Sequence, residues 1–411
     1  MEKNELVTQS HPPEPLSETL PFPSKKDKKK NIWQWIGIYL IILLVLFSVV
    51  CYFLSKKNIS QISPSNYPTS TITGRVSVPI DRISKLHVLG NHIVNEEGQT
   101  IRLRGVNFED PFMLEKGANE NGVVDNHFSK IAEDFARVKA LGVNVVRLPV
   151  YPGYYFLVGG DKYLTTYVDR MIDLAEQNGL YAIISYHVIG KPGGWYESDS
   201  DTTMLPNYPA KVHYTDTNMT VAFWNKVTTR YGQRKHVLFE MYNEPVGMLD
   251  PTNDDFTWAK WRPTGQLLIT TIRQHSDNII LGSGPKYTGD LSDVPTNPYT
   301  DSNLVYVAHI YPNTVPKGDD QITEWERRFG FLSSTYPVIV SEWGFHNGAK
   351  DETVNGTLEG FAKPLIDYLD QKNISWVAYV YHPPYDEPPM LESDWVTLNE
   401  FGQFVAKRLQ M

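Results

Sequence analysis

Cysteine is almost absent from the chain, with Cys51 as the only one among 411 residues. A single thiol can form neither an internal disulfide nor a zinc–thiolate cluster, so both kinds of scaffold are excluded. No glycine-rich phosphate loop follows any apolar run, and the HExxH and GxSxG motifs are also missing. Phosphoryl transfer and amide hydrolysis are therefore not indicated, and we expect no metal ion and no organic cofactor.

Beyond residue 60, acidic residues outnumber basic residues. The formal net charge is −9, yet residues 1–60 contain eight lysines against only five acidic residues. The remainder is thus more acidic than the chain as a whole. Because an acidic surface repels phosphate backbones, we expect no nucleic-acid partner.

One long run without charge is present, Ile36 to Leu54, which spans 19 positions. It is long enough to cross a bilayer as a helix, and five lysines between residues 25 and 30 precede it while only Lys56 and Lys57 follow. A cleaved signal peptide and a buried helix are the alternatives, but more than thirty residues precede the run and its flanks are charged and proline-rich. We therefore predict a transmembrane anchor over residues 31–55, with a cytoplasmic N-terminus and the rest of the chain outside the cell.

The composition on either side of this run predicts the domain organisation. Residues 1–30 form a disordered cytoplasmic tail, because they are rich in proline and poor in bulky apolar groups. Residues 56–79 are rich in Ser, Thr and Pro, and they form a linker. Residues 80–411 form the folded body of this cell-membrane protein.

The body begins with a hairpin-like stretch whose turn is Gly90-Asn91, and then alternates short β-branched runs with amphipathic segments such as Phe128–Ala140, Tyr167–Asn178 and Phe329–Leu332. Apolar runs that alternate with helices indicate parallel strands covered by helices. The eight runs are Ile101–Val106, Val143–Leu148, Tyr181–Tyr186, Val237–Tyr242, Ile279–Gly282, Leu304–His309, Pro337–Ser341 and Ile374–Val380. Their number predicts a (β/α)8 TIM barrel after a short β-hairpin; an open doubly wound sheet is the alternative, but it lacks its phosphate loop.

Polar residues follow five of these runs, at the end where a barrel places its chemistry. They are Arg147, His187, Asn243-Glu244-Pro245, His309 with Tyr311, and Glu342-Trp343-Gly344. Two carboxyls, Glu244 and Glu342, would then meet in one mouth. Hydrolysis of a glycosidic bond requires such a pair, because one carboxyl protonates the leaving oxygen while the other attacks the anomeric carbon or guides water to it.

The motifs LRGVN at 103–107, NEP at 243–245, HIY at 309–311 and SEWG at 341–344, with Arg147 and His187, resemble those of the family 5 glycoside hydrolases, the cellulase family. The resemblance covers about residues 85–411. It implies a retaining mechanism with Glu244 as acid/base and Glu342 as nucleophile. It also implies that Asn243 binds the sugar 2-hydroxyl, that Arg147 and Tyr311 hold Glu342 ionised, and that His187 and His309 line the cleavage subsite.

The same resemblance implies a polysaccharide or oligosaccharide substrate, with endo-β-1,4-glucanase as the leading activity. Mannan, xyloglucan and β-1,3-glucan are alternative substrates, since loops decide specificity within one fold. A non-catalytic, surface-tethered carbohydrate-binding protein on the same barrel is the alternative function, and the presence of both glutamates and Arg147 argues against it.

Each site residue also has a structural interpretation. Arg147 could be a structural ion-pair donor, His187 and His309 could be core histidines, and Glu240 and Glu400 are expected to be solvated surface groups. The family commonly places a Trp under the sugar at the end of the last strand. In this sequence Trp376 falls early in the last predicted strand. The position three residues later, where that Trp is expected, holds Tyr379.

Aromatic rings on predicted mouth loops are candidates for stacking on sugar. They are Trp195, Tyr196, Tyr287, Trp343 and Trp395. Trp224, Trp258 and Trp325 fall within helical patterns, and we expect them to pack between helix and barrel.

Overall fold

The computed structural model of the protein describes residues 83–117, 125–192, 211–247, 256–314, 320–384 and 387–411. No helix among these residues is long and apolar enough to span a membrane. The predicted tail, anchor and linker (1–79), and Trp195 and Tyr196, lie outside the described residues.

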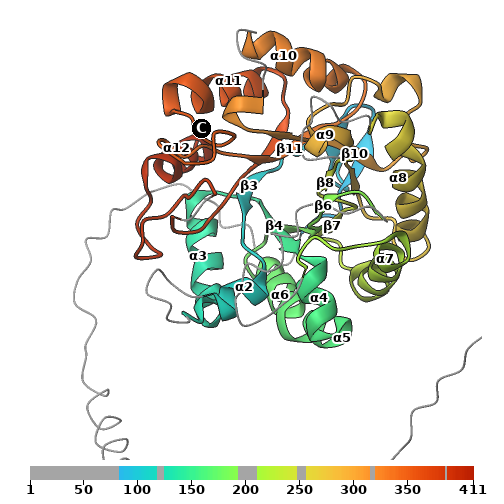
Figure 1. Cartoon of the computed structure of the whole chain (residues 1–411), viewed down its shortest axis with the longest axis horizontal. Coiled ribbons are helices and arrows are strands. Elements are labelled where there is room, and N and C mark those ends of the chain that lie inside the picture. The colour runs from blue at the N-terminus through green and yellow to red at the C-terminus, as the bar shows by residue number, and fades with distance from the viewer. Residues whose placement is uncertain (1–82, 118–124, 193–210, 248–255, 315–319, 385–386) are drawn as a thin grey trace, which may run out of the picture. The chain divides into compact units, whose positions relative to one another are not determined.

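Eight parallel strands close into a barrel at the centre of the body, surrounded by helices (Figure 1). The predicted barrel is therefore confirmed, and the open sheet is excluded. Around the barrel the order is β10-β11-β12-β3-β4-β5-β7-β9. The strands are β3 (Arg104–Asn107), β4 (Val145–Val150), β5 (Tyr181–Tyr186), β7 (Val237–Glu240), β9 (Ile280–Gly282), β10 (Leu304–Ile310), β11 (Val338–Trp343) and β12 (Ser375–Ala378).

Alternating side chains along these strands build two separate cores, because successive residues of a strand point to opposite faces. The inner core fills the barrel with one branched residue from most strands, among them Val145, Ile183 and Val307. The outer core lies between the strands and the helices. Gly105 in β3 permits a close approach to β4, since a Cβ there would lie 1.8 Å from the carbonyl oxygen of Val145.

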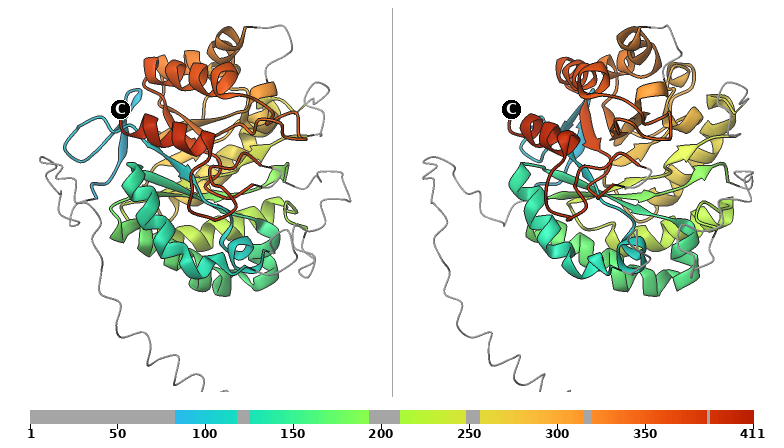
Figure 2. Two further views of the ribbon diagram at one scale, coloured as in Figure 1. Left: turned by 90° about the vertical axis from the view of Figure 1, so that its left-hand side faces the viewer. Right: turned by 60° about the vertical axis from the view of Figure 1, so that its left-hand side comes forward.

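A hairpin precedes the barrel, as predicted, and it lies at the N-terminal ends of the strands. Strands β1 (His87–Leu89) and β2 (His92–Val94) pair antiparallel around Gly90, whose φ is +62°. Leu86 and Ile93 pack into the inner core from below. In Figure 2 the hairpin projects at one end of the barrel, opposite the end that carries the strand-to-helix loops.

Two of the predicted helical segments, Phe128–Ala140 and Tyr167–Asn178, agree closely with helices of the structure. The described α-helices lie around the barrel. They are α2 (Pro111–Lys116), α3 (Ile131–Leu141), α4 (Pro152–Val158), α5 (Gly160–Tyr163), α6 (Asp169–Gln177), α7 (Thr217–Tyr231), α8 (Trp258–Arg273), α9 (Pro285–Thr288), α10 (Gln321–Arg328), α11 (Lys363–Gln371) and α12 (Glu400–Leu409). The predicted helix at Phe329–Leu332 is wrong, because a 3-10 helix (Gly330–Ser334) follows α10 there. Trp224, Trp258 and Trp325 are buried against the barrel, as expected.

Candidate active site

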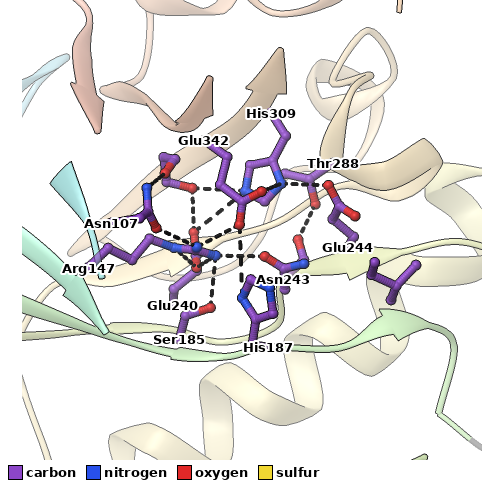
Figure 3. A network of polar contacts seen from close by, with 12 residues as sticks. Asn107, Arg147, Ser185, His187, Glu240, Asn243, Glu244, Thr288, His309 and Glu342 are labelled. Carbon is purple, nitrogen blue, oxygen red and sulfur yellow. Dashed lines mark hydrogen bonds and ion pairs between the residues drawn. The ribbon is translucent and has the colours of Figure 1, made fainter. Parts of the chain in front are cut away.

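A polar layer lies on top of the inner core, at the carboxyl ends of the strands (Figure 3). Its position follows from the alternation of side chains, since every member but Asn107, which follows Gly105, stands two residues beyond an apolar residue of the inner core. Ile183 and Leu238, for example, precede Ser185 and Glu240 by two positions. The members of the layer are Asn107, Arg147, Ser185, Glu240, His309 and Ser341.

A bulge in β11 brings Glu342 into this layer beside Ser341. Ala308 of β10 pairs with Val340, but the next residue, His309, pairs with Glu342, so that Ser341 is the extra residue. Bulges of this kind re-aim side chains beside active sites. Ser341 and Glu342 therefore both face the barrel axis, although they are neighbours in the chain.

Arg147 is the centre of the polar layer and is fully buried. Its Nε donates to Glu240 Oε2 at 2.6 Å, and its Nη1 donates to Glu342 Oε1 at 2.6 Å. Its Nη2 donates to Ser185 Oγ at 2.9 Å and to Asn243 Oδ1 at 2.7 Å. The planar guanidinium thus fixes two carboxylates and one amide, a geometry that Lys could not reproduce.

Glu342 is surrounded by donors. Besides Arg147, the hydroxyl of Tyr311 donates to its Oε2 at 3.0 Å. His187 Nδ1 lies 3.9 Å from Oε1 and is a buried nitrogen without a hydrogen-bond partner among the described residues. Donors thus hold both oxygens of this carboxylate in place, as the alignment of a nucleophile requires.

Glu244 lies on β8 (Glu244–Pro245), a two-residue strand that continues from β7 and pairs with β6 (Ile189–Gly190). Its Oε1 lies 2.9 Å from Nδ1 of His309. One carboxylate oxygen of Glu244, one of Glu342 and a ring nitrogen of His309 all lie within 4.8 Å of one another. This separation is close to that of a retaining pair, about 5–5.5 Å, and well below the 6.5–9.5 Å or so of an inverting pair.

Burial and neighbouring charges shift the pKa values of Glu244 and Glu240 in opposite directions. Burial raises the pKa of Glu244, and the charge of Glu342 raises it further against the effect of His309. Burial would also raise the pKa of Glu240, but Arg147 and His309 outweigh it and lower that pKa to about 2. A raised pKa is what Glu244 needs to hold a proton for a leaving group, whereas Glu240 stays ionised.

The two histidines have opposite environments. Burial lowers the pKa of His187 well below its usual range, and the charge of Arg147 acts in the same direction, so this ring is neutral. Burial alone would lower the pKa of His309 as well, but the nearby carboxylates of Glu342, Glu240 and Glu244 raise this pKa to about 9.

The structure brings together all eight of the predicted site residues, from strand ends far apart in the sequence. Arg147, His187, Asn243, Glu244, His309, Tyr311, Glu342 and Tyr379 are each less than a tenth exposed or at that limit. The expectation for Glu240 is wrong, since this residue is 0% exposed and ion-paired with Arg147. Its even spacing from Leu238, an inner-core residue, was the signal that would have placed it inside the barrel. Glu400 is exposed, as expected.

Trp343 is not a sugar platform. It stands one residue beyond Glu342, so its ring points away from the mouth and packs edge-on against Trp376 and Phe401. Trp376 is buried in the same outer core and is not part of the mouth. Tyr379, three residues later, has the opposite parity, and its ring is parallel to that of His187 within 5° at a centroid distance of 6.4 Å.

The position of Tyr379 depends on Gly344, which follows β11 and has no side chain. A Cβ on Gly344 would lie 2.4 Å from the carbonyl oxygen of Tyr379, so only glycine allows this approach. Tyr379 also packs in one apolar cluster with Tyr311. Trp395 is half-buried and stacks on His127 at 3.6 Å, and Tyr287 is half-buried on α9; both stay candidates for sugar contact.

Sequence reasoning missed other members of the site. Asn107 accepts from Arg147 Nη1, and Ser341 donates to Glu240 Oε1 at 2.5 Å. Glu387, in the segment after β12, is a further carboxyl near the mouth; burial and the charges of Glu342 and Glu109 raise its pKa to about 8. Asn107 and Ser341 lie within the family motifs, whereas Glu387 has no signal in the sequence.

Glu, His and Glu are also residue types that bind cations. In this site, however, their ligand atoms are already engaged. Both ring nitrogens of His309 have partners, Glu244 and Ser341, and the two oxygens of Glu342 accept from Arg147 and Tyr311. The arrangement is that of a hydrogen-bonded acid network.

Two opposed carboxyls at the mouth of a (β/α)8 barrel, one bound by an arginine and a tyrosine and the other raised in pKa, define a glycoside hydrolase. Residues 94–384 match the family model described as cellulase, glycosyl hydrolase family 5. The chain belongs to this family.

Its relatives and structural neighbours carry related names. Cellulase CelDZ1 of Thermoanaerobacterium sp. is 24% identical over 85% of either chain. Endoglucanase A of Butyrivibrio fibrisolvens is 27% identical over 66% of this chain, which spans only 54% of that relative's length. The fold is similar to that of β-glucanase SdGluc5_26A from Saccharophagus degradans in complex with cellotetraose, with a TM-score of 0.67 at 24% identity over 85% of this chain and 98% of that one.

Proposed function

We propose that the protein is a retaining endo-β-1,4-glucanase in which Glu244 is the acid/base and Glu342 the nucleophile. The observation that carries the proposal is the pair itself: two carboxyls with oxygens within 4.8 Å, one held by Arg147 and the other with its pKa raised by burial. A protonated acid facing an anion is what double displacement requires.

The proposed reaction has two steps. In the first, Glu244 gives its proton to the glycosidic oxygen while the bond from that oxygen to the anomeric carbon breaks, and an oxygen of Glu342 forms a covalent bond to that carbon. In the second, water attacks the same carbon, Glu244 takes a proton from the water, and the bond to Glu342 breaks. Arg147 and Tyr311 hold Glu342 in line for both steps, because their bonds fix each of its oxygens.

A β-1,4-linked glucan is the preferred substrate because relatives of the chain are named cellulases and endoglucanases, and one structural neighbour is a complex with cellotetraose. Tyr379 is proposed as the floor beneath the sugar at the cleavage point, in the slot that a Trp commonly fills. Mannan, xyloglucan and β-1,3-glucan stay alternative substrates, since the loops that decide between them differ within the family.

We also propose that the enzyme is held at the cell surface by residues 31–55, with the catalytic domain, residues 80–411, outside the cell. The support is the uncharged run Ile36 to Leu54 and the excess of lysine before it. Partition of the full chain into the membrane fraction, resistant to alkaline carbonate washing, is expected. Release into the wash would contradict the anchor without touching the chemistry.

The activity is tested by incubating the full chain with soluble cellulose, mannan, xyloglucan and β-1,3-glucan. We expect reducing ends to appear fastest from soluble cellulose, together with an early fall in viscosity that marks internal cleavage. Binding to cellulose without release of reducing ends would instead favour a non-catalytic carbohydrate-binding protein.

A further inference from the structure

Glu240 is joined to both proposed catalytic carboxyls, although it cannot touch a sugar because it is fully buried beneath them. On one side its Oε2 accepts from Arg147 Nε at 2.6 Å, and Arg147 donates to Glu342. In the view of Figure 3 the side chain of Glu240 lies below those of Glu342 and Glu244.

The other side of Glu240 leads to the acid/base. The hydroxyl oxygen of Ser341 lies 2.5 Å from Glu240 Oε1. On its other side, this Ser341 oxygen lies 2.9 Å from Nε2 of His309. Nδ1 of that ring then lies 2.9 Å from Glu244 Oε1. Four side chains from β7, β11, β10 and β8 therefore form one continuous chain of hydrogen bonds.

Donor and acceptor chemistry fixes the protons along this chain. Glu240 is ionised at any working pH, since its pKa is lowered to about 2, and an ionised carboxylate can only accept. Ser341 must therefore donate its one proton to Glu240, which leaves only lone pairs for His309. Nε2 of His309 consequently carries a proton.

At the far end of the ring, one proton lies between Nδ1 and Glu244. Two arrangements are possible, imidazolium with carboxylate or imidazole with carboxylic acid, and both contain the same number of protons. Because Nε2 keeps a proton of its own, the proton between Nδ1 and Glu244 is a second one, and its loss to the substrate leaves the ring as neutral imidazole. Coupled pairs of this kind lose such a proton in a step that belongs to the pair.

We propose that Glu240, acting through Ser341, is a positioning residue that fixes the protonation of His309, so that His309 and Glu244 share the proton that is delivered to the leaving sugar. The inference rests on the proposed role of Glu244 as acid/base. When the glycosidic bond breaks, the leaving oxygen takes the shared proton and Glu342 bonds to the anomeric carbon. The attacking water restores the shared proton in the second step, and the protons on Nε2 and Ser341 stay in place throughout.

The charges around the ring set the pH at which the shared proton is lost. The groups that face His309 are Glu240 of β7, Glu244 of β8 and Glu342 of β11, while His187 and Arg147 lie beyond them. The three carboxylates hold a proton on the ring against the effect of burial. Loss of the link to Glu240 therefore weakens proton binding and moves the alkaline limb of activity to lower pH.

Ser341→Ala tests the link, and Ser185→Ala is its matched control. Both serines are fully buried in the polar layer, and both contact Glu240, but Ser185 lies on the Arg147 side and not beside His309. The measurement is kcat/KM against pH for the full chain and each variant on soluble cellulose, with thermal unfolding as the check on folding. We expect the alkaline limb of Ser341→Ala to fall by about one pH unit, and that of Ser185→Ala to stay within about 0.3 units of the parent.

An aryl glycoside with a good leaving group gives an independent readout. It needs no proton to depart, so at pH values between the alkaline limbs of the two proteins Ser341→Ala should cleave it at close to the parent rate, while its activity on cellulose is already reduced. A folded, active Ser341→Ala whose alkaline limb matches the parent would overturn the link alone. A parent chain that hydrolyses no glycan would overturn the proposed function as well, so the two failures are distinguishable.

Discussion

Nη1 of Arg147 lies 2.6 Å from Oε1 of Glu342, although 195 positions separate the two residues in the chain. The contact crosses the barrel mouth from β4 to β11, and it is completely enclosed on the arginine side. Because the same guanidinium also binds Glu240 and Asn243, one side chain aligns the nucleophile and the residue next to the acid/base. Barrel geometry thus converts separate strand ends into one rigid site.

Replacement of Arg147 by Lys should damage activity and stability together. A lysine keeps one charge but cannot reach both carboxylates, so one of them is left buried without its cationic partner, at a cost of about 3–5 kcal/mol. We expect kcat on soluble cellulose to fall at least about 100-fold and the unfolding midpoint in urea to drop. The matched control is Arg327→Lys, in the half-exposed pair with Glu324, which should change stability by less than about 0.5 kcal/mol. Parent-like turnover in R147K would contradict the role given to Arg147.

The two catalytic carboxyls should respond differently to loss of charge. Glu342→Gln removes the nucleophile, and we expect no measurable turnover of any glycoside. Glu244→Gln removes proton donation in the first step and proton acceptance from water in the second, so cellulose hydrolysis should fall by about 10²–10⁴. An activated aryl group should still be released as a burst, because its departure needs no proton and the covalent intermediate then accumulates. Glu400→Gln, on the exposed start of α12, is the control and should match the parent. Equal losses in both variants on both substrates would argue against separate roles.

Stability should depend on pH through Glu240. Its pKa is about 2 in the folded protein, below the usual value of 4.5, so the stabilisation is present above about pH 4.5 and is lost as the pH falls towards 2. A depression of this size corresponds to about 3 kcal/mol. We expect the free energy of unfolding of the parent to decline over this interval. Glu240→Gln should be less stable at neutral pH and show a smaller decline, and equal slopes for both proteins would contradict this assignment.

Tyr379 and Trp343 should separate substrate binding from packing. Tyr379→Ala should raise KM and lower kcat/KM, because the ring beside His187 at the mouth is lost, whereas Tyr379→Trp should retain activity. Trp343→Phe should lower the unfolding midpoint, by about 1–2 kcal/mol in stability, with KM unchanged. A raised KM in a folded W343F would restore Trp343 to the mouth.

The barrel could be read from the sequence because each strand is a short apolar run with a helix after it, and because helix ends carry glycine, as at Gly142, whose φ is +102°. The catalytic pair could be read because motif residues follow those runs directly. Both signals are local.

The predictions for Glu240 and Trp343 were wrong because the location of each side chain depends on the direction in which it leaves its strand. Glu240 was expected at the surface because a charged residue usually lies there, but the alternation from Leu238 points it into the barrel, where Arg147 compensates its burial. Trp343 was expected at the mouth because it follows Glu342, but the bulge at Ser341 turns Glu342 inward and leaves Trp343 outward. A bulge depends on the pairing of two strands, and no local pattern announces it.

The central claim is that Glu342 attacks the anomeric carbon while Glu244 donates the proton. It is tested most directly by following the anomers of the first products from a β-linked cello-oligosaccharide by proton NMR, before mutarotation. We expect the β anomer to appear first, because two displacements at one carbon restore its configuration. An initial α anomer would show a single displacement by water and would contradict the mechanism.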